Sequence, residues 1–129
     1  MKNLISINDL SKNEILNLIN LALEIKKNSN KYSEKLKNKT LFMFFEKPSL
    51  RTRVSFEVAM NQLGGSALYY DLLGSPLKVG KETIEDTAKV ISRYCDGIAA
   101  RVFEQETLEK LSRNSNVPVI NALSDYEHP

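Results

Sequence analysis

The feature that most constrains the fold is a short apolar run, Thr40-Leu41-Phe42-Met43-Phe44-Phe45. It has no polar alternation, which is typical of a β-strand covered on both faces. Three more short apolar segments follow it and predict further strands, at 67–70, 97–100 and 117–122. Helical patterns lie between them, and this alternation predicts right-handed crossovers and a parallel sheet. The expected fold is α/β: a three-layer sandwich with a central four-stranded parallel sheet flanked by helices.

Four helices are expected between and before the strands. The first starts at a capping box made by Ser11 and Glu14, and it ends where the polar segment 26–38 begins. Apolar residues at helical spacing should form its inner face: Ile15, Leu18, Ile19, Ala22 and Ile25. The other helices are expected at about 51–63, 82–94 and 104–113. Their inward positions should include Val54, Val58, Leu63, Ile84, Ala88 and Ile91, and Gly64-Gly65 should end the second helix.

Composition limits the classes of function. The 129 residues suit one domain, and 42% hydrophobic with 26% charged residues is the balance of a soluble globular protein. The net charge of +2 gives no indication of a nucleic-acid or membrane surface, and the lysine-rich stretch 26–39 is interpreted as a solvated connector. The amino-terminal residues do not resemble a signal peptide, and the single cysteine, Cys95, fits a reducing compartment. We therefore expect a cytoplasmic protein in which Cys95 is a buried structural thiol rather than a nucleophile.

Chemistry is expected in three loops that leave the carboxyl ends of the predicted strands, at 46–50, 101–104 and 123–129. Ligands of parallel α/β sheets bind at that edge. The sequence contains neither GxGxxG nor GxxxxGK[ST], which excludes the usual nucleotide cradles. It also lacks the paired histidines or cysteines that are typical of a metal site, so we expect no metal and no cofactor.

The first of these loops carries the most informative run, Ser49-Leu50-Arg51-Thr52-Arg53. A strand leads through a short turn directly into a helix, whose first N–H groups have no intrahelical partners and attract anions. Arg51 and Arg53 oppose the helix dipole unless an anion is present, while guanidinium groups match phosphate oxygens. The alternative is an ordinary capped helix with two exposed arginines, but the pattern favours a phosphate site.

The other two loops each deliver one candidate residue to the same edge. Arg101 follows the third strand, and His128, the only histidine, lies in the loop after the fourth. Taken alone, Arg101 would be interpreted as a surface arginine, and a lone histidine near a terminus is uninformative. Their shared edge with Ser49 makes both residues candidates for the same site.

At this point the motifs resemble a known family. The segment Phe45-Glu46-Lys47-Pro48-Ser49-Leu50-Arg51-Thr52-Arg53 is similar to the carbamoyl-phosphate signature of the transcarbamylases, whose core reads S-T-R-T-R. The resemblance continues in register through Gln62-Leu63-Gly64-Gly65, Ala100-Arg101 and Asn121-Ala122-Leu123-Ser124-Asp125 to His128-Pro129. The F-E-K-P-S form and the N-x-L-S-D-x-x-H-P ending look more like the ornithine than the aspartate branch of the family.

The resemblance implies transfer of a carbamoyl group from carbamoyl phosphate to an amine, with release of phosphate. Ser49, Leu50 through its backbone, Arg51 and Thr52 would hold the phosphate. Arg101 would bridge the phosphate and the carbonyl oxygen, and His128 would donate to that oxygen as it gains charge. Arg53 is expected to support the loop rather than touch substrate. The family forms trimers with active sites completed across subunits, so a homotrimer is implied as well.

Three departures from the family accompany this resemblance. Leu50 stands where the family has threonine. The loop 74–81 lacks the family's glutamine that reaches a neighbouring subunit; Leu77 lies near that position, with Lys78 beside it as a substitute. Residues 1–129 resemble only the carbamoyl-phosphate domain, and the amino-acid-binding domain is absent. The leading interpretation is the amino-terminal part of an ornithine carbamoyltransferase of arginine biosynthesis, inactive alone; the alternatives are an aspartate or modified-ornithine enzyme, or a non-catalytic phosphate-binding or assembly module.

Overall fold

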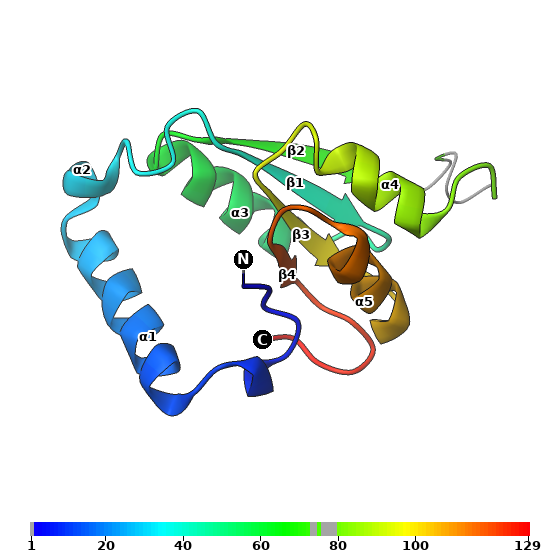
Figure 1. Cartoon of the computed structure of the whole chain (residues 1–129). Coiled ribbons are helices and arrows are strands. Elements are labelled where there is room, and N and C mark those ends of the chain that lie inside the picture. Colours follow the sequence, from blue (N-terminus) through cyan, green and yellow to red (C-terminus); the bar gives the residue numbers. More distant parts are fainter. Residues whose placement is uncertain (1, 73–74, 76–79) are drawn as a thin grey trace.

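The computed structural model describes residues 2–72, 75 and 80–129, and Figure 1 shows the arrangement of its elements. Strands and helices alternate along most of the chain after an initial helical segment. In order, the elements are η1 (Ile7–Asp9), α1 (Lys12–Lys27), α2 (Ser29–Tyr32), β1 (Thr40–Phe45), α3 (Leu50–Gln62), β2 (Ser66–Asp71), α4 (Ile84–Ile91), β3 (Gly97–Arg101), α5 (Gln105–Asn114) and β4 (Val119–Asn121).

The four strands form one parallel sheet in the order β2-β1-β3-β4. The apolar run 40–45 is β1 and lies in the interior of the sheet, where it pairs with β2 on one side and β3 on the other. The register places Phe45 opposite Arg101 of β3, so the carboxyl ends of these two strands coincide. The predicted α/β fold with a four-stranded parallel sheet is confirmed.

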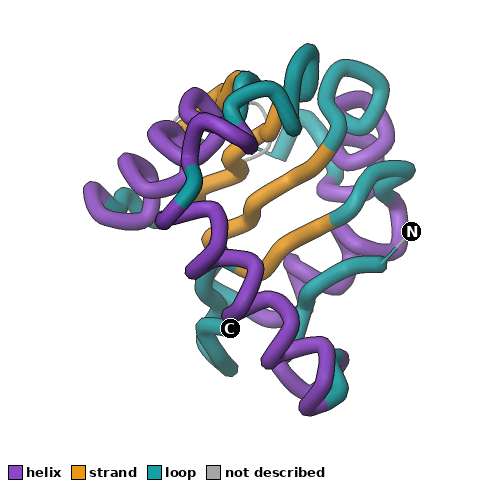
Figure 2. The backbone as a smooth tube through the Cα atoms, turned by 90° about the vertical axis from the view of Figure 1, so that its left-hand side faces the viewer, coloured by secondary structure: helices purple, strands orange, loops and turns teal. Residues whose placement is uncertain are grey.

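Helices cover both faces of this sheet. On one face, Phe44 and Ile98 pack with residues of α4 and α5 such as Ala88 and Leu108. On the other face, Met43 and Phe45 pack against Met60 of α3. Alternate residues of β1 therefore enter two separate cores, which is why its sequence is apolar throughout after Thr40. Figure 2 shows the strands between these helical layers, as the three-layer prediction requires.

Two details of the predicted packing are wrong. β2 is an edge strand with a half-exposed face, and Leu68 retains 52% of its accessible surface. On α3, Val54 and Val58 are exposed, whereas Phe56 and Met60 pack on the sheet. The helix is rotated relative to the prediction because its aromatic and thioether side chains fill the core beside β1. On α4, by contrast, Ala88 and Ile91 are buried as expected.

The first helix also differs from its prediction. Ser11 and Glu14 form the expected capping box, but α1 buries none of its residues. Leu16, Leu18, Ile19, Leu21 and Leu23 are all exposed. Figure 1 shows why: α1 extends away from the sheet rather than packing across it. The stretch after α1 is not a featureless connector either, since it contains α2 and buries Tyr32.

Gly64 ends α3 in the left-handed conformation that the sequence predicts, with φ of +85°. A Cβ atom there would lie 2.5 Å from the backbone oxygen of Ser33, so the position requires glycine for space as well as conformation. No helix in the described part of the chain is long and apolar enough to span a bilayer.

Candidate functional site

Backbone hydrogen bonds join the three loops at the carboxyl edge of the sheet. The N–H of Glu46 donates to the carbonyl of Arg101 at 2.8 Å, which links the first loop to the second. The N–H of Val102 donates to Leu123 O at 2.9 Å, and the N–H of Asp125 donates to Phe103 O at 3.0 Å, which link the second loop to the third. The prediction that the three loops share one edge is confirmed.

The first loop opens α3 with Ser49 as its N-cap. The Ser49 hydroxyl accepts from the N–H of Thr52 at 3.4 Å and donates to the Thr52 Oγ1 at 3.0 Å. The N–H groups of Leu50 and Arg51, at the start of the helix, have no intrahelical acceptor. No acidic residue occupies the first turn, so nothing there offsets the positive end of the helix dipole. The turn is therefore electrostatically suited to an anion.

The two arginines of this turn have different surroundings. The Nε of Arg53 donates to the carboxylate of Glu57 at 2.8 Å, and its guanidinium lies 3.9 Å from the centre of the Tyr69 ring. Arg53 is exposed as well, but both contacts are with residues of its own chain, which fits a supporting role. Arg51 and Leu50 are exposed, and Leu50 retains 79% of its accessible surface. The guanidinium of Arg51 thus belongs to the solvent-facing side of the helix start.

Arg101 is the last residue of β3 and is half-buried. Its Nε atom is buried and has no hydrogen-bond partner among the described residues. Buried donors are almost always paired, so an unpaired one at a ligand-binding edge is a candidate to bind a ligand oxygen. Arg101 considered by itself would be interpreted as a surface arginine, and the shared edge made it a candidate for the site; the buried Nε supports that candidacy.

His128 is exposed and lies at the end of a tightly organised loop. The Ser124 hydroxyl accepts from the N–H groups of Tyr126 and Glu127 at 3.2 and 3.3 Å and donates to Gln105 Oε1 at 2.6 Å. Asp125 Oδ1 accepts from the N–H of Gln105 at 2.8 Å. The start of α5 therefore supports the loop that carries the only histidine.

Glu46 supports the edge that carries the candidate site, and the sequence did not indicate this. Its Oε2 accepts from the N–H of Phe103 at 2.8 Å, and its own N–H donates to Arg101 O. Lys47 Nζ lies 4.9 Å from the centre of the Phe103 ring, which adds a cation–π contact between the same loops. The only signal was the F-E-K-P-S pattern, which does not specify a hydrogen-bond partner.

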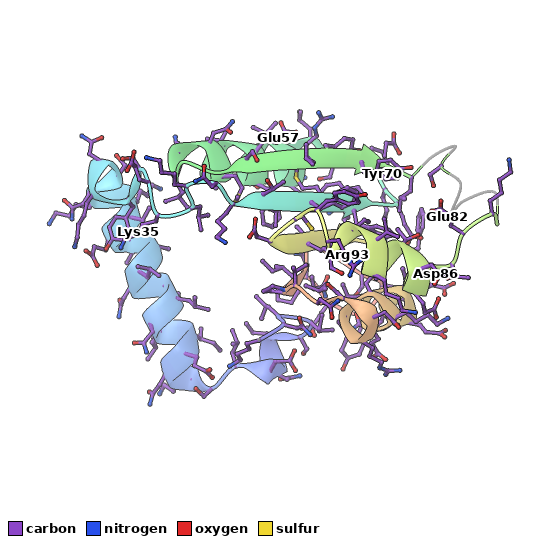
Figure 3. All side chains as sticks on the ribbon, turned by 45° about the horizontal axis from the view of Figure 1, so that its top comes forward. Lys35, Glu57, Tyr70, Glu82, Asp86 and Arg93 are labelled. Carbon is purple, nitrogen blue, oxygen red and sulfur yellow. The ribbon has the colours of Figure 1, made fainter. Side chains whose placement is uncertain are left out.

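The proposed inter-subunit residues Leu77 and Lys78 lie outside the described residues. Among the described residues, a groove runs between β2 and α4. Its lining includes Tyr70, Glu82 and Asp86, which Figure 3 labels on these neighbouring parts of the chain. The groove combines an apolar floor with two carboxylates, so it does not resemble a phosphate site.

Cys95 is buried, and its thiol donates to the carbonyl of Ile91 at 3.2 Å. Burial raises the pKa of the Cys95 thiol, which disfavours the thiolate. The expected burial of Cys95 is thus confirmed. In the described part of the chain, no group of three or more His, Cys, Asp or Glu side chains could hold a metal ion.

The fold and this edge define a class: a parallel α/β domain whose helix start is electrostatically suited to an anion, next to an arginine whose Nε has no partner among the described residues. The chain belongs to the aspartate/ornithine carbamoyltransferase family, since the family's carbamoyl-P binding domain matches residues 2–129.

Named relatives agree with this family. The chain is 53% identical to an ornithine carbamoyltransferase of Methanosarcina mazei, across 99% of this chain and 43% of the relative. The structure of ornithine carbamoyltransferase from Pyrococcus furiosus superposes with a TM-score of 0.92 at 46% identity, covering 99% of this chain and 41% of the other. An acetylornithine transcarbamylase complexed with acetylcitrulline matches at 31% identity and a TM-score of 0.86, covering 100% of this chain and 44% of the other. The chain therefore spans less than half the length of these relatives.

Proposed function

We propose that residues 1–129 bind carbamoyl phosphate as one half of an ornithine carbamoyltransferase. The complete protein would transfer the carbamoyl group to the side-chain amine of ornithine and release citrulline and phosphate. The observation that carries this proposal is the joined edge. The Ser49-capped helix start follows the end of β1, and the Nε of Arg101, which has no partner among the described residues, lies at the end of the neighbouring β3. Relatives named ornithine carbamoyltransferase, such as the enzyme from Campylobacter fetus at 50% identity, support the choice of acceptor.

Each residue would have a distinct role. Ser49, the backbone N–H of Leu50, Arg51 and Thr52 would hold the phosphate at the positive end of α3. Arg101 would bridge the phosphate and the carbonyl oxygen. His128 would donate to that oxygen as the tetrahedral transition state develops negative charge. The mechanism requires no covalent intermediate, metal or cofactor, because positioning the labile donor next to the amine supplies the remaining acceleration.

The similarity to ornithine carbamoyltransferases also motivates proposals for the second domain and the assembly. An amino-acid-binding domain would follow residue 129, and the isolated chain would bind carbamoyl phosphate weakly without turnover. The exposed apolar residues of α1 favour a larger assembly in which that helix is covered. A cytoplasmic homotrimer in arginine metabolism is our working picture; biosynthesis is the expected direction, although relatives such as that of Halobacterium salinarum are named catabolic.

Three alternatives remain. The acetylornithine transcarbamylase neighbour favours a modified ornithine as a second candidate acceptor, while an aspartate enzyme belongs to the same family. Acceptor choice would depend largely on the second domain, so assays of the complete protein with each amino acid separate these enzymes. A non-catalytic phosphate-binding or assembly module is the third candidate, and it is motivated by Leu50 and by the missing glutamine of the loop 74–81.

The carbamoyl-phosphate site is tested by calorimetric titration of the chain with carbamoyl phosphate and with inorganic phosphate. We expect Arg51→Ala to weaken binding of both by at least about tenfold, because a charged hydrogen-bonding partner is lost. Arg113→Ala is the matched control, since Arg113 is exposed on α5 and pairs with Glu109. Equal binding by the wild-type and Arg51→Ala proteins would remove the site assignment.

A further inference from the structure

The loop that ends at His128 is organised around the side chain of Asn121, the last residue of β4. Asn121 retains only 3% of its accessible surface. Its Oδ1 accepts from the N–H of Leu123 at 2.8 Å, and its Nδ2 donates to Ile5 O at 2.9 Å and to Glu127 O at 3.3 Å. One buried amide therefore joins both ends of the loop to each other and to the amino-terminal segment.

The backbone inside this loop is strained. Leu123 has φ of +136°, a conformation that a residue with a branched side chain rarely adopts. Two hydrogen bonds hold it there: its N–H donates to Asn121 Oδ1, and its carbonyl accepts from the N–H of Val102. Strained residues persist when their surroundings over-determine them, and they cluster at functional sites. Asn121 supplies one of the two restraints.

The amino-terminal segment extends this arrangement along the sheet edge. Leu4 forms a parallel bridge with Ile120, with its N–H donating to Val119 O at 2.9 Å and its carbonyl accepting from the N–H of Asn121 at 2.8 Å. Further along, the N–H of Ile7 donates to Glu127 Oε2 at 3.3 Å. Glu127, the residue before His128, therefore contacts the amino-terminal segment through its carboxylate and Asn121 through its backbone carbonyl.

We propose that Asn121 is a positioning residue for His128: its amide fixes the loop 122–127 against the amino-terminal segment and so sets where the imidazole stands. This inference rests on the proposed role of His128 in donating to the carbonyl oxygen. Asn121 itself touches no ligand. It restricts the conformations of the loop before binding, so that less conformational entropy of His128 is lost when carbamoyl phosphate binds.

Asn121→Asp separates this role from general packing. The substitution preserves size and the Oδ1 acceptor for Leu123, but places an oxygen where the amide donates to two carbonyls. Asn114→Asp is the matched control, because Asn114 is a half-buried asparagine whose Nδ2 donates to Lys110 O at the far end of α5. Circular dichroism and thermal melting verify that both variants fold.

The first readout needs no ligand. The chain has a single histidine, so the imidazole NMR signals report on His128 alone. We expect Asn121→Asp to change the chemical shifts and relaxation of His128 towards those of a mobile histidine, whereas Asn114→Asp leaves them unchanged. In the wild-type protein, the N–H of Leu123 and the side-chain amide of Asn121 should exchange slowly with solvent. Rapid exchange of both would overturn the proposal even if Asn121→Asp failed to fold.

The second readout is the preference for carbamoyl phosphate over inorganic phosphate, which lacks the carbonyl oxygen. We expect Asn121→Asp to weaken carbamoyl-phosphate binding about tenfold and phosphate binding less than about twofold. This is the effect of losing one hydrogen bond to the carbonyl oxygen, which phosphate lacks. His128→Ala should give the same pattern, and adding Asn121→Asp to it should reduce the preference no further. Additive losses would show that Asn121 does not act through His128.

These outcomes separate the two proposals. If Arg51→Ala binds both ligands as the wild type does, the proposed phosphate site is wrong. If Arg51→Ala loses binding and His128→Ala loses the carbamoyl preference, while Asn121→Asp keeps both the preference and the His128 signals, then the site stands and the positioning role is wrong.

Discussion

The carboxylate of Glu46 accepts a hydrogen bond from the N–H of Phe103 at 2.8 Å, and this contact joins the loop after β1 to the segment that follows Arg101. The same residue donates its N–H to Arg101 O, so Glu46 contacts the backbone on both sides of Val102. The strand end that carries Arg101 is thereby fixed to the loop that leads into Ser49. Glu46 therefore fixes the positions of Ser49 and Arg101, two proposed ligand-binding residues, relative to each other without itself having to touch the ligand.

We expect Glu46→Ala to weaken carbamoyl-phosphate binding about tenfold, because a hydrogen bond to a charged acceptor is lost and the Arg101 segment loosens. Glu46→Gln retains an acceptor oxygen and should restore most of the affinity. Calorimetric titration provides the measurement. Glu104→Ala is the control, since Glu104 precedes α5 without a side-chain capping bond. Equal losses in Glu46→Ala and Glu104→Ala would contradict a specific role for Glu46.

Leu50 gives the opposite kind of prediction, a gain of affinity. Leu50→Thr introduces a hydroxyl at an exposed position of the anion-binding turn, and we expect carbamoyl phosphate and phosphate to bind about 3- to 10-fold more tightly. Leu50→Val is close to threonine in shape but lacks the hydroxyl, so it should bind as the wild type does. Affinity that is the same in the threonine and valine variants would show that the hydroxyl does not reach the ligand.

The ion pair between Asp96 and Lys39 should make the stability of the folded chain depend on pH. The Lys39 ammonium at 2.8 Å and the N–H of Thr40 hold the pKa of the Asp96 carboxyl below its ordinary value. The folded state therefore favours the ionised form: the stabilisation is present above the unfolded-state pKa and is lost as pH falls through the folded-state pKa.

Asp96→Asn should lower the melting temperature by about 2 °C at pH 7, a small effect because the pair is exposed. The difference between variant and wild type should shrink below about pH 4, where the unfolded-state carboxyl becomes protonated. Thermal melts between pH 2 and pH 7 measure this. Melting curves that stay separated by the same amount at all pH values would contradict the assignment.

The exposed apolar side of α1 predicts self-association of the isolated chain. Leu18 and Leu21 line a groove with Leu4 and Ile120, yet both leucines are exposed. We expect Leu18→Gln with Leu21→Gln to shift the chain towards monomer at about 100 μM, with little change in melting temperature. Sedimentation velocity measures the species. Leu23→Gln is the control because Leu23 is exposed on the same helix outside that groove, and an equal shift from it would show that the groove itself is not involved.

Much of this protein was predictable because the relevant forces are local. The apolar run 40–45, the Ser11–Glu14 capping box and the left-handed Gly64 depend on neighbours within a few residues, and the structure has each as expected. The order of strands and helices also placed the three loops at one edge, since parallel strands end on the same side. The sequence by itself thus determined the fold class and where to look for the site.

The tertiary structure decided what depends on distant partners. Val54 and Val58 have the helical spacing of an inner face, but the volume available beside β1 selects Phe56 and Met60 instead. The side chains of Glu46 and Asn121 were assigned no role because their partners lie 57 residues and 116 residues away, at Phe103 and Ile5. Hydrogen bonds over such separations follow from strand order and loop geometry, which no local pattern encodes. The sequence therefore indicated the proposed donors at this edge, and the folded chain decided which residues support the loops that carry them.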